Sequence, residues 1–325
     1  MGLSPAVLQA HVDHWQQELT RGNRRYRRHW PSRLFRHEAV ENAALILRSG
    51  QLLSRVDSEG LRALDIAPAE IIQRRLAAHQ YVRLYFRPKS PTQYRIEGVR
   101  KRQEIYQGRH APVLVIFIFK AMDILGEPDV RFSNGNMQSP STREGSTDRD
   151  FQAIPFGFVY HDGAYDRSTD ASQEIRRCRC AEVLVPSPMA LEGRLQAVLC
   201  RSPAERATLL HMLGDHAAAW SDRVRTFSEP GLFENTYAYV DGIDGTDKGV
   251  FFTLHPRRDG AEIKTEVWLQ DENGAVILHA GPSEISASHP WQVGEGLGPG
   301  AYTVRIHLED CLACEASILI DDLPF

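Results

Sequence analysis

Three short segments, far apart along the chain, hold side chains suited to chemistry on a phosphorylated sugar. They are residues 35–37 (Phe-Arg-His) with Asn42, residues 71–75 (Ile-Ile-Gln-Arg-Arg) with 85–91 (Tyr-Phe-Arg-Pro-Lys-Ser-Pro), and residues 179–185, which contain Glu182. Arginine guanidiniums can hold a pyrophosphate, and a carboxylate can stabilise a sugar cation. An enzyme that splits a ribosyl bond and passes the sugar to an acceptor needs these parts.

Glu182 is the strongest candidate for the reacting carboxylate. It interrupts an apolar segment, with Ala181 before it and residues 183–185 (Val-Leu-Val) after it. Breaking an N-glycosidic bond to ribose creates an oxocarbenium-like transition state that a carboxylate stabilises, and the same group can deprotonate the incoming nucleophile. A carboxylate on a buried strand is costly unless it reaches a cleft or a partner. The structural alternative is an outward-facing residue on an edge strand.

The remaining candidates are each ambiguous when taken singly. Arg75 offers a planar fork for phosphate, although adjacent arginines on a helix are usually solvated. Tyr85 and Phe86 could stack on nicotinamide, or could pack in the core. A third group could contact a ribose or a carboxamide, or simply be hydrogen-bonded within the fold: Arg36, His37 and Asn42.

Hydrophobic periodicity and turn residues predict the elements that position these side chains. We expect helices at 5–20, 42–47 (ended by Gly50), 67–76 and 203–212, and a further one reaching about 225. We expect strands at 34–36, 81–86, 113–119 and 181–185, and a long loop at 133–150 that is rich in Ser, Gly, Asn and Thr. This mixture predicts an α+β catalytic domain.

The pattern changes after a Ser-Glu-Pro-Gly sequence at 228–231. Short alternating segments at 237–240, 250–255, 262–269, 275–279 and 301–307 are separated by glycine-containing turns. This spacing predicts a small all-β sandwich. We therefore divide the chain of 325 residues into an N-terminal helix and basic arm (1–33), a catalytic domain (34–228) and an acidic β-sandwich domain (229–325).

Charge is distributed unevenly along the chain. Residues 1–110 contain 20 Lys and Arg against 10 Asp and Glu, whereas residues 229–325 contain 5 against 17. A basic N-terminal part is typical of proteins that bind a polyanion, such as nucleic acid or a dinucleotide. Arginines also alternate with Tyr and Trp at 24–30, which suits phosphate contact and base stacking. The alternatives are a solvated arginine-rich surface and an arm that packs on its own domain.

Cysteine usage and hydropathy exclude several classes of protein. The five cysteines do not have the spacing of a disulfide framework, and Cys311 and Cys314 would need a distant second pair to complete a zinc site. We expect reduced, structural cysteines and no metal. The longest apolar run, 113–119, is too short to cross a bilayer, and the N-terminus shows no secretory pattern. We expect a cytoplasmic location and no membrane partner.

The order of these pieces resembles the DarT family, the DNA-targeting ADP-ribosyltransferase toxins. The resemblance runs from about Leu34 to about Leu213. Its anchors are Asn42 with 46–53, Ile66-Ala67 together with 71–75, the Tyr-Phe-x-Pro-Lys-Ser-Pro sequence at 85–91 with Tyr94, the apolar run 113–119, and 181–185. Five pieces in the right order are more specific than any one of them.

The resemblance implies a compact ADP-ribosyltransferase fold that uses NAD as a substrate and transfers ADP-ribose to thymidine in single-stranded DNA. By position, Glu182 and Arg75 match the catalytic residues of the family. We expect NAD to contact Arg36, His37, Asn42, Tyr85 and Phe86, and DNA to contact Arg87, Lys89 and Tyr94. The loop 133–150 and the residues just before Glu182 would approach the target base.

The chain also departs from the family pattern. The first family motif commonly presents Tyr-His, whereas this chain has Phe35-Arg36 with His37 displaced by one position. The N-terminal arm and the acidic C-terminal domain lie outside the minimal toxin. The resemblance implies a toxin or phage-defence effector with an antitoxin protein as partner. Two alternatives remain open: transfer to RNA, protein or water (an NAD glycohydrolase), and a non-catalytic nucleic-acid-binding module with a β-sandwich interaction domain.

Overall fold

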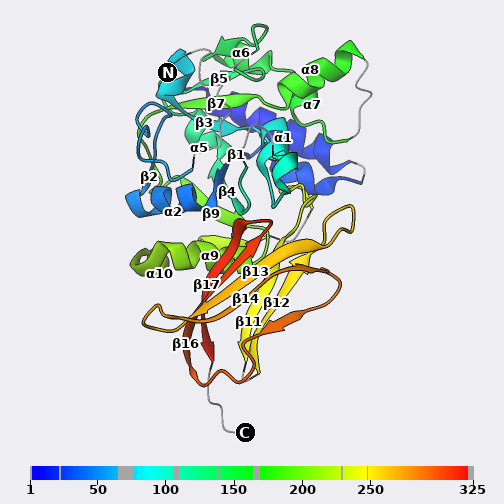
Figure 1. Ribbon diagram of the computed structural model, residues 1–325. Coiled ribbons are helices and arrows are strands. Elements are labelled where there is room, and N and C mark those ends of the chain that lie inside the picture. Colours follow the sequence, from blue (N-terminus) through cyan, green and yellow to red (C-terminus); the bar gives the residue numbers. More distant parts are fainter. Residues whose placement is uncertain are drawn as a thin grey trace.

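The computed structural model describes residues 2–21, 23–64, 76–105, 110–137, 139–163, 169–227, 230–246 and 248–320 (Figure 1). The helix expected at 67–76, with Arg75, lies almost entirely outside these residues. Among the described residues, no helix is both long and apolar enough to span a membrane.

An eight-stranded sheet forms the centre of the N-terminal two thirds, in the order β10-β9-β4-β1-β3-β7-β5-β6. Its strands are β1 Arg33–Ala39, β3 Tyr81–Tyr85, β4 Leu114–Lys120, β5 Arg131–Ser133, β6 Glu144–Gly145, β7 Glu182–Pro186, β9 Leu195–Cys200 and β10 Val224–Thr226. Neighbouring strands are antiparallel except β9 and β10. The unbroken apolar run in β4 is buried, as its lack of alternation predicts. The predicted strands at 34–36, 81–86, 113–119 and 181–185 are therefore confirmed.

Helices surround this sheet. They are α1 Pro5–Thr20, α2 Val40–Ser49, α4 Pro91–Ile96, α5 Ala121–Leu125, α6 Asp148–Gln152, α7 Phe156–Val159, α8 Asp170–Cys178, α9 Pro203–Leu213 and α10 Ala217–Trp220, with short 3-10 segments η1 Arg25–His29, η2 Leu76–Gln80, η3 Arg102–Glu104 and η5 Gly214–His216. A two-stranded sheet pairs β2 Gln51–Leu52 with β8 Met189–Ala190. The C-terminal end of α2 lies where the sequence predicts it, because Gly50 adopts a left-handed φ of 69° that terminates the helix.

The basic arm packs on its own domain. Trp30 is buried beneath the guanidinium of Arg87, 4.7 Å from the ring centroid. The Tyr26 hydroxyl donates to Asp162 at 2.5 Å, and Arg27 donates to the Tyr160 carbonyl at 2.8 Å. The aromatic residues of the arm are thus used in packing rather than presented for base stacking.

The segment 133–150, expected to be one long loop, contains short regular elements. Phe132 pairs with Gly145 across β5 and β6, which extends the large sheet by two strands. Thr147 and Asp150 then form a capping box that begins α6. The expectation of a single loop was wrong because these local hydrogen bonds outweigh the low apolar content.

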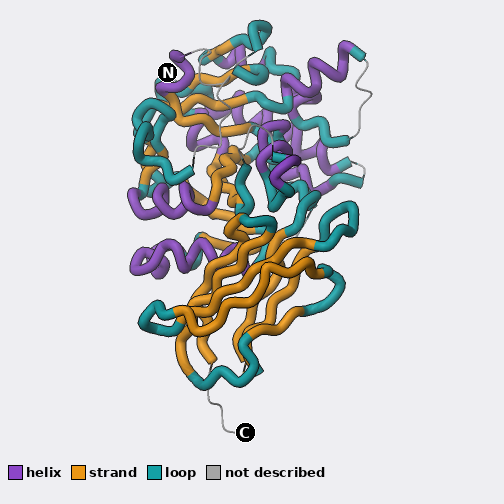
Figure 2. The backbone as a smooth tube through the Cα atoms, viewed as in Figure 1, coloured by secondary structure: helices purple, strands orange, loops and turns teal. Residues whose placement is uncertain are grey.

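Two further antiparallel sheets follow at the C-terminal end. One has the order β11-β12-β15 and the other β14-β13-β16-β17. Their strands are β11 Tyr239–Thr246, β12 Gly249–His255, β13 Ile263–Gln270, β14 Val276–Ile285, β15 Trp291–Val293, β16 Gly300–Leu308 and β17 Cys311–Ile320. Figure 2 shows that this part is built from strands, whereas the helices gather in the other part. Sequence periodicity missed β17, whose Cys311 and Cys314 drew attention as metal ligands.

The two parts share an interface centred on α9, which lies against β17 and β11 (Figure 1). Thr208 of α9 accepts a hydrogen bond from the Glu315 backbone at 3.1 Å. Ala204 of α9 and Val99 also join the apolar core of the C-terminal sheets. The C-terminal sheets are thus packed against the N-terminal part through buried contacts.

Candidate functional site

A cavity of about 400 Å³ lies over the neighbouring strands β1, β3 and β7 of the large sheet. Its walls come from α2, the segment from Gln51 to Leu64, and two residues of α4, Thr92 and Ile96. Asn136, which follows β5, also borders the cavity. The sheet order explains how residues separated by almost 150 positions meet, because β3 lies between β1 and β7. All three segments selected from the sequence contribute to this region.

The charges on the cavity wall favour an anionic ligand. Its described lining contains four arginines and two glutamates: Arg36, Arg55, Arg62, Arg83, Glu38 and Glu182. Guanidiniums bind phosphate oxygens through paired N–H groups. Apolar and aromatic side chains supply much of the remaining surface, as is typical of a small-molecule site. The cavity is therefore suited to a ligand with phosphates and planar rings.

Glu182 lies at the start of β7, directly opposite Tyr85 in the β3–β7 register. Its side chain is only 4% exposed, and its Oε2 lies 3.6 Å from Nη1 of Arg83. Among the described residues, this buried oxygen has no hydrogen-bond partner. Burial raises the pKa of Glu182 above its ordinary value, while Arg83 and Arg36 act in the opposite direction. A buried carboxylate oxygen without a hydrogen bond can accept one from a ligand.

Arg83 is a site residue that sequence reasoning missed. It lies on β3 between Tyr81 and Tyr85, and all three line the cavity. Glu182 raises the pKa of Arg83, so the guanidinium is charged beside the carboxylate. The strand period of two places residues 81, 83 and 85 on one face. That period was the signal available in the sequence.

Arg36 is held in a fixed orientation at the cavity wall. Its Nε donates to Oε1 of the buried Glu38 at 2.7 Å, and its Nη1 donates to the Arg83 carbonyl at 3.0 Å. These contacts restrain the guanidinium before any ligand binds. Such restraint lowers the entropic cost of holding an anion.

His37 and Tyr85 form a stacked pair beside this charge cluster. Their ring centroids lie 5.2 Å apart and their planes are inclined by 14°. Burial, assisted by Arg36 and Arg83, lowers the pKa of His37 to about 3, so its imidazole is neutral at physiological pH. Burial likewise raises the pKa of Tyr85, which keeps the phenol protonated. The pair offers a neutral aromatic surface.

Asn42 lines the cavity but has a structural task as well. Its Nδ2 donates to the Leu64 carbonyl at 2.7 Å, and its Oδ1 accepts from the Leu64 backbone N–H at 3.0 Å. This two-way contact fixes the segment that leads from β2 over the cavity. The amide that was expected to contact the ligand thus uses both of its groups on the protein.

Two residues of the Tyr-Phe-Arg sequence lie elsewhere. Phe86 is buried in the core, where its ring meets Phe156 edge-on with 5.4 Å between the ring centroids. It faces away from Tyr85 because neighbouring residues of an extended chain point to opposite sides of the sheet. Arg87 is 1% exposed and donates to the carbonyls of Pro88 and Val159. Neither lines the cavity, so the structure separates Phe86 from Tyr85 and makes Arg87 a buried packing residue rather than a surface contact for DNA.

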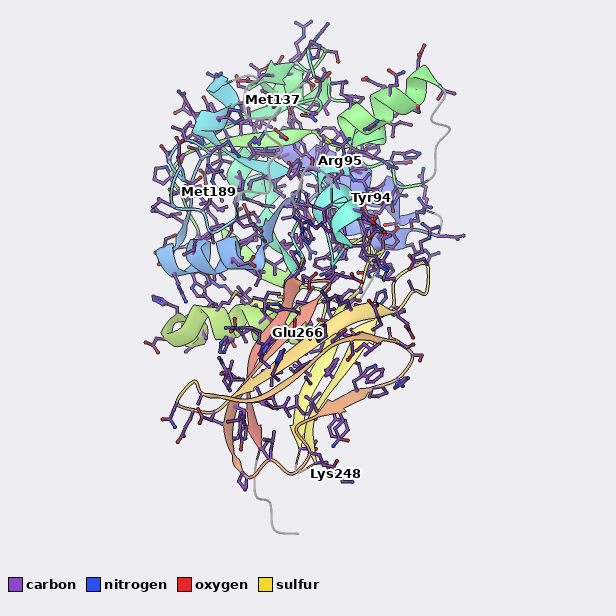
Figure 3. All side chains as sticks on the ribbon, viewed as in Figure 1. Tyr94, Arg95, Met137, Met189, Lys248 and Glu266 are labelled. Atoms are coloured by element: carbon purple, nitrogen blue, oxygen red, sulfur yellow. The ribbon has the colours of Figure 1, made fainter. Side chains whose placement is uncertain are left out.

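The two other residues expected at DNA, Tyr94 and Lys89, are not among the residues that line the cavity. Tyr94 is 48% exposed on α4, the helix that also carries the cavity residues Thr92 and Ile96. Figure 3 labels it beside Arg95, within the N-terminal part. Lys89 is partly buried, with its Nζ 3.9 Å from Oε2 of Glu234. Arg75, the other expected catalytic residue, lies outside the described residues.

The cysteines and other metal-binding side chains give no positive sign of a metal centre. All five cysteines are free thiols, and Cys311 and Cys314 lie on β17. Within the described ranges, no group of three or more His, Cys, Asp or Glu side chains is arranged as a metal site.

Comparison with known proteins identifies the family of the chain. A family model described as "ssDNA thymidine ADP-ribosyltransferase, DarT" matches residues 35–229. No curated protein matches the chain. Among solved structures, Thermus sp. 2.9 DarT in complex with ADP-ribosylated ssDNA is similar in fold, with a TM-score of 0.50 and 21% identity over 61% of this chain and 95% of that one.

Two further solved structures match with lower scores. Thermus sp. 2.9 DarT in complex with NAD+ has a TM-score of 0.47 at 20% identity and covers 61% of this chain and 96% of that chain. Thermosipho africanus DarTG in complex with ADP-ribose has a TM-score of 0.46 at 20% identity and covers 61% and 50%. The resemblance drawn from the sequence is confirmed by the family match, which covers more than half of the chain. The protein belongs to the DarT family of single-stranded-DNA thymidine ADP-ribosyltransferases, enzymes that use NAD.

Proposed function

We propose that this NAD-dependent ADP-ribosyltransferase holds NAD in the cavity over β1, β3 and β7 and transfers ADP-ribose to thymine with Glu182 as the catalytic carboxylate. The observation that carries this assignment is the environment of Glu182. Its carboxylate is buried at the cavity wall, 3.6 Å from the Arg83 guanidinium, with an oxygen that has no hydrogen-bond partner among the described residues.

The reaction breaks the bond between the anomeric carbon of ribose and the nicotinamide nitrogen. Nicotinamide leaves with the bonding electron pair, and positive charge develops on the ribose. Ionised Glu182 stabilises that charge, as carboxylates do in glycoside hydrolysis. A ring nitrogen of thymine then forms the new bond to the anomeric carbon while its proton passes to the carboxylate.

The other cavity residues have roles in binding. Arg36 and Arg83 provide positive charge for the pyrophosphate, and the neutral His37–Tyr85 stack provides a surface for a planar ring. Asn42 keeps the Leu64 segment in place over the ligand. Arg75 keeps its proposed catalytic role by the family resemblance alone. Tyr94, half-exposed on α4, is the candidate to stack on a DNA base.

The biological role that fits this reaction is that of a toxin. A thymine that carries ADP-ribose on a ring nitrogen has a bulky group at its pairing edge, so the modified strand cannot serve as a normal template. We infer a cytoplasmic effector that is neutralised by an antitoxin protein.

Its C-terminal residues 229–325 would form a sandwich-type domain, separate from the catalytic domain at 34–228.

The test uses labelled NAD with two single-stranded oligonucleotides that differ only in whether they contain thymine. Label on the thymine-containing strand alone is the expected result, and Glu182→Ala should abolish it. Label on both strands, on RNA or on protein would instead favour the alternative acceptors. Free ADP-ribose as the main product would indicate hydrolysis, and the absence of any NAD turnover would refute the assignment.

A further inference from the structure

The helix α4, with Glu97 as the residue that caps its C-terminal end, presents two rows of side chains to two different neighbours. Thr92 and Ile96, four positions apart, line the cavity. Gln93 and Glu97, also four positions apart, are buried at 0% and 2% exposure on the side that faces residues 232–235. Residues spaced by four lie above one another on a helix. A short element therefore joins the wall of the cavity directly to the segment that enters the C-terminal sheets.

The Gln93 side chain contacts a residue before α4, a residue after α4 and Leu232. Its Oε1 accepts from the Lys89 backbone N–H at 2.8 Å and so supports the left-handed turn at Lys89, where φ is 53°. Its Nε2 donates to Oε2 of Glu97 at 2.8 Å and to the Leu232 carbonyl at 2.7 Å. The two bonds that Nε2 donates are short and buried, and the one to the Glu97 carboxylate belongs to the stronger, charge-assisted kind.

Glu97 continues the connection into the linker, which is the segment 232–238 that leads to β11. Its Oε1 accepts from the backbone N–H groups of Glu234 at 2.8 Å and Asn235 at 3.1 Å. The same oxygen lies 3.8 Å from Nη1 of Arg201. One buried carboxylate therefore satisfies two linker amides and the Gln93 side chain, and balances part of the charge of an arginine.

The linker is also anchored just beyond this point. The Val99 backbone N–H donates to the Ala238 carbonyl at 3.2 Å in an isolated antiparallel bridge. The Arg100 guanidinium stacks over the Tyr237 ring at 4.0 Å. Because β11 begins at Tyr239, the first C-terminal strand is fixed to the residues that follow α4.

We propose that residues 232–235 act as a strap that holds α4 against the cavity, with Gln93 and Glu97 as positioning residues for NAD. The inference rests on the proposed function of the cavity. The C-terminal part lies beyond the family match at 35–229. Under this proposal it contributes to catalysis, because the C-terminal sheets hold the strap in place. Loosening the strap moves the Thr92–Ile96 wall while the carboxylate of Glu182, on β7, stays in place.

Glu97→Gln weakens this connection with the smallest change in shape. The amide oxygen can still accept from the two linker N–H groups, but its NH₂ then faces the NH₂ of Gln93, so the Gln93 bond to residue 97 is lost and the strap loses its charged acceptor. We expect the KM for NAD to rise on the order of 10-fold, the loss that follows removal of one buried hydrogen bond. The kcat should change by less than about threefold, since chemistry at Glu182 is untouched.

Two further variants of the full-length chain separate positioning from general stability. Gln93→Met removes the donor to Glu97 and Leu232 at similar volume and should give the same rise in KM. Thr208→Val removes an acceptor elsewhere in the interface, at α9 and β17, and should lower the melting temperature without changing the KM.

The outcomes distinguish the strap from the proposed function itself. A wild-type protein that does not turn over NAD would refute the function. An active wild type with an unchanged KM in Glu97→Gln and Gln93→Met would refute the strap alone. Equal KM changes in Thr208→Val, or failure of both α4 variants to fold, would also overturn it, because the contacts would then serve stability rather than positioning.

Discussion

Two of the arginine–glutamate pairs with a buried carboxylate, Arg201–Glu205 and Arg83–Glu182, differ in how completely the glutamate is hydrogen-bonded. At the interface between the two parts, Arg201 donates from Nε to Oε1 of Glu205 at 2.9 Å and from its backbone to Oε2 at 3.1 Å. It also donates to the Pro112 carbonyl at 2.8 Å and stacks over Tyr239. In the cavity, Arg83 and Glu182 approach only to 3.6 Å, and Oε2 of Glu182 has no hydrogen bond among the described residues.

Burial alone does not distinguish the two glutamates, because it raises the pKa of both. The difference lies in the remaining bonding capacity. Both oxygens of Glu205 accept hydrogen bonds from Arg201, although Nη1 of Arg201 has no hydrogen-bond partner among the described residues. A buried glutamate with both oxygens hydrogen-bonded is bound to the fold, whereas one with an unused oxygen beside a cavity can change partners when a ligand arrives. The comparison indicates that Glu205 stabilises the structure and Glu182 performs chemistry.

Removing one partner of the interface pair should have the largest effect on stability. Glu205→Ala leaves the guanidinium of Arg201 buried without its carboxylate, which costs about 3–5 kcal/mol of the free energy of unfolding. Chemical denaturation, followed by intrinsic fluorescence, measures this loss. The protein that remains folded should still transfer ADP-ribose at the wild-type kcat, and a selective loss of kcat would show that the interface pair belongs to the site.

Removing the arginine of the cavity pair should affect activity more than stability. Arg83→Met deletes the cation beside Glu182 and beside the expected pyrophosphate. We predict a fall in kcat/KM on the order of 10- to 100-fold, which corresponds to about 1.5–3 kcal/mol for a contact to a charged group. Steady-state kinetics with Arg83→Lys as the matched control should show partial recovery. Unchanged kcat/KM in Arg83→Met would mean that the pair does not bind the ligand.

The pH dependence of activity offers a smaller but more specific effect. Burial raises the folded-state pKa of Glu182 above the ordinary value of 4.5, so protonation removes the active carboxylate at a pH above 4.5. We expect kcat/KM to fall as pH is lowered through that raised pKa. Because Arg83 lowers the pKa of Glu182, the acid limb should move to higher pH in Arg83→Met.

His37 provides the control for this profile. Its pKa is lowered to about 3, so the imidazole does not titrate between pH 5 and 8. The acid limb should therefore keep its position in His37→Gln. Movement of the limb in that variant, but not in Arg83→Met, would assign it to His37 and contradict the role of Glu182.

The sequence was sufficient for the parts of the site that follow from local pattern. The apolar runs predicted β4 and β7, and Gly50 predicted the end of α2. Arg83 was missed because the resemblance drew attention to Tyr85 and Phe86, although alternation along β3 places Arg83 with Tyr85.

Other features depend on tertiary contacts that no local pattern contains. Arg87 resembled a surface cation, yet it is buried where carbonyls from a distant segment, including Val159, accept its N–H groups. The strand β17 was not predicted, although its cysteines were expected to be structural; it forms by pairing with β16. The connection of Gln93 and Glu97 to the linker could not be predicted either, because the linker lies about 140 positions further along the chain.

The most direct test of the comparison replaces Glu182 and Glu205 separately by glutamine. It measures the transfer of ADP-ribose to a thymine-containing strand per folded molecule. Mass spectrometry of the oligonucleotide gives the rate. The account predicts that Glu182→Gln loses on the order of 10³-fold in transfer while remaining folded, and that Glu205→Gln is destabilised but transfers normally. Normal transfer by folded Glu182→Gln would contradict the assignment of Glu182 as the catalytic carboxylate.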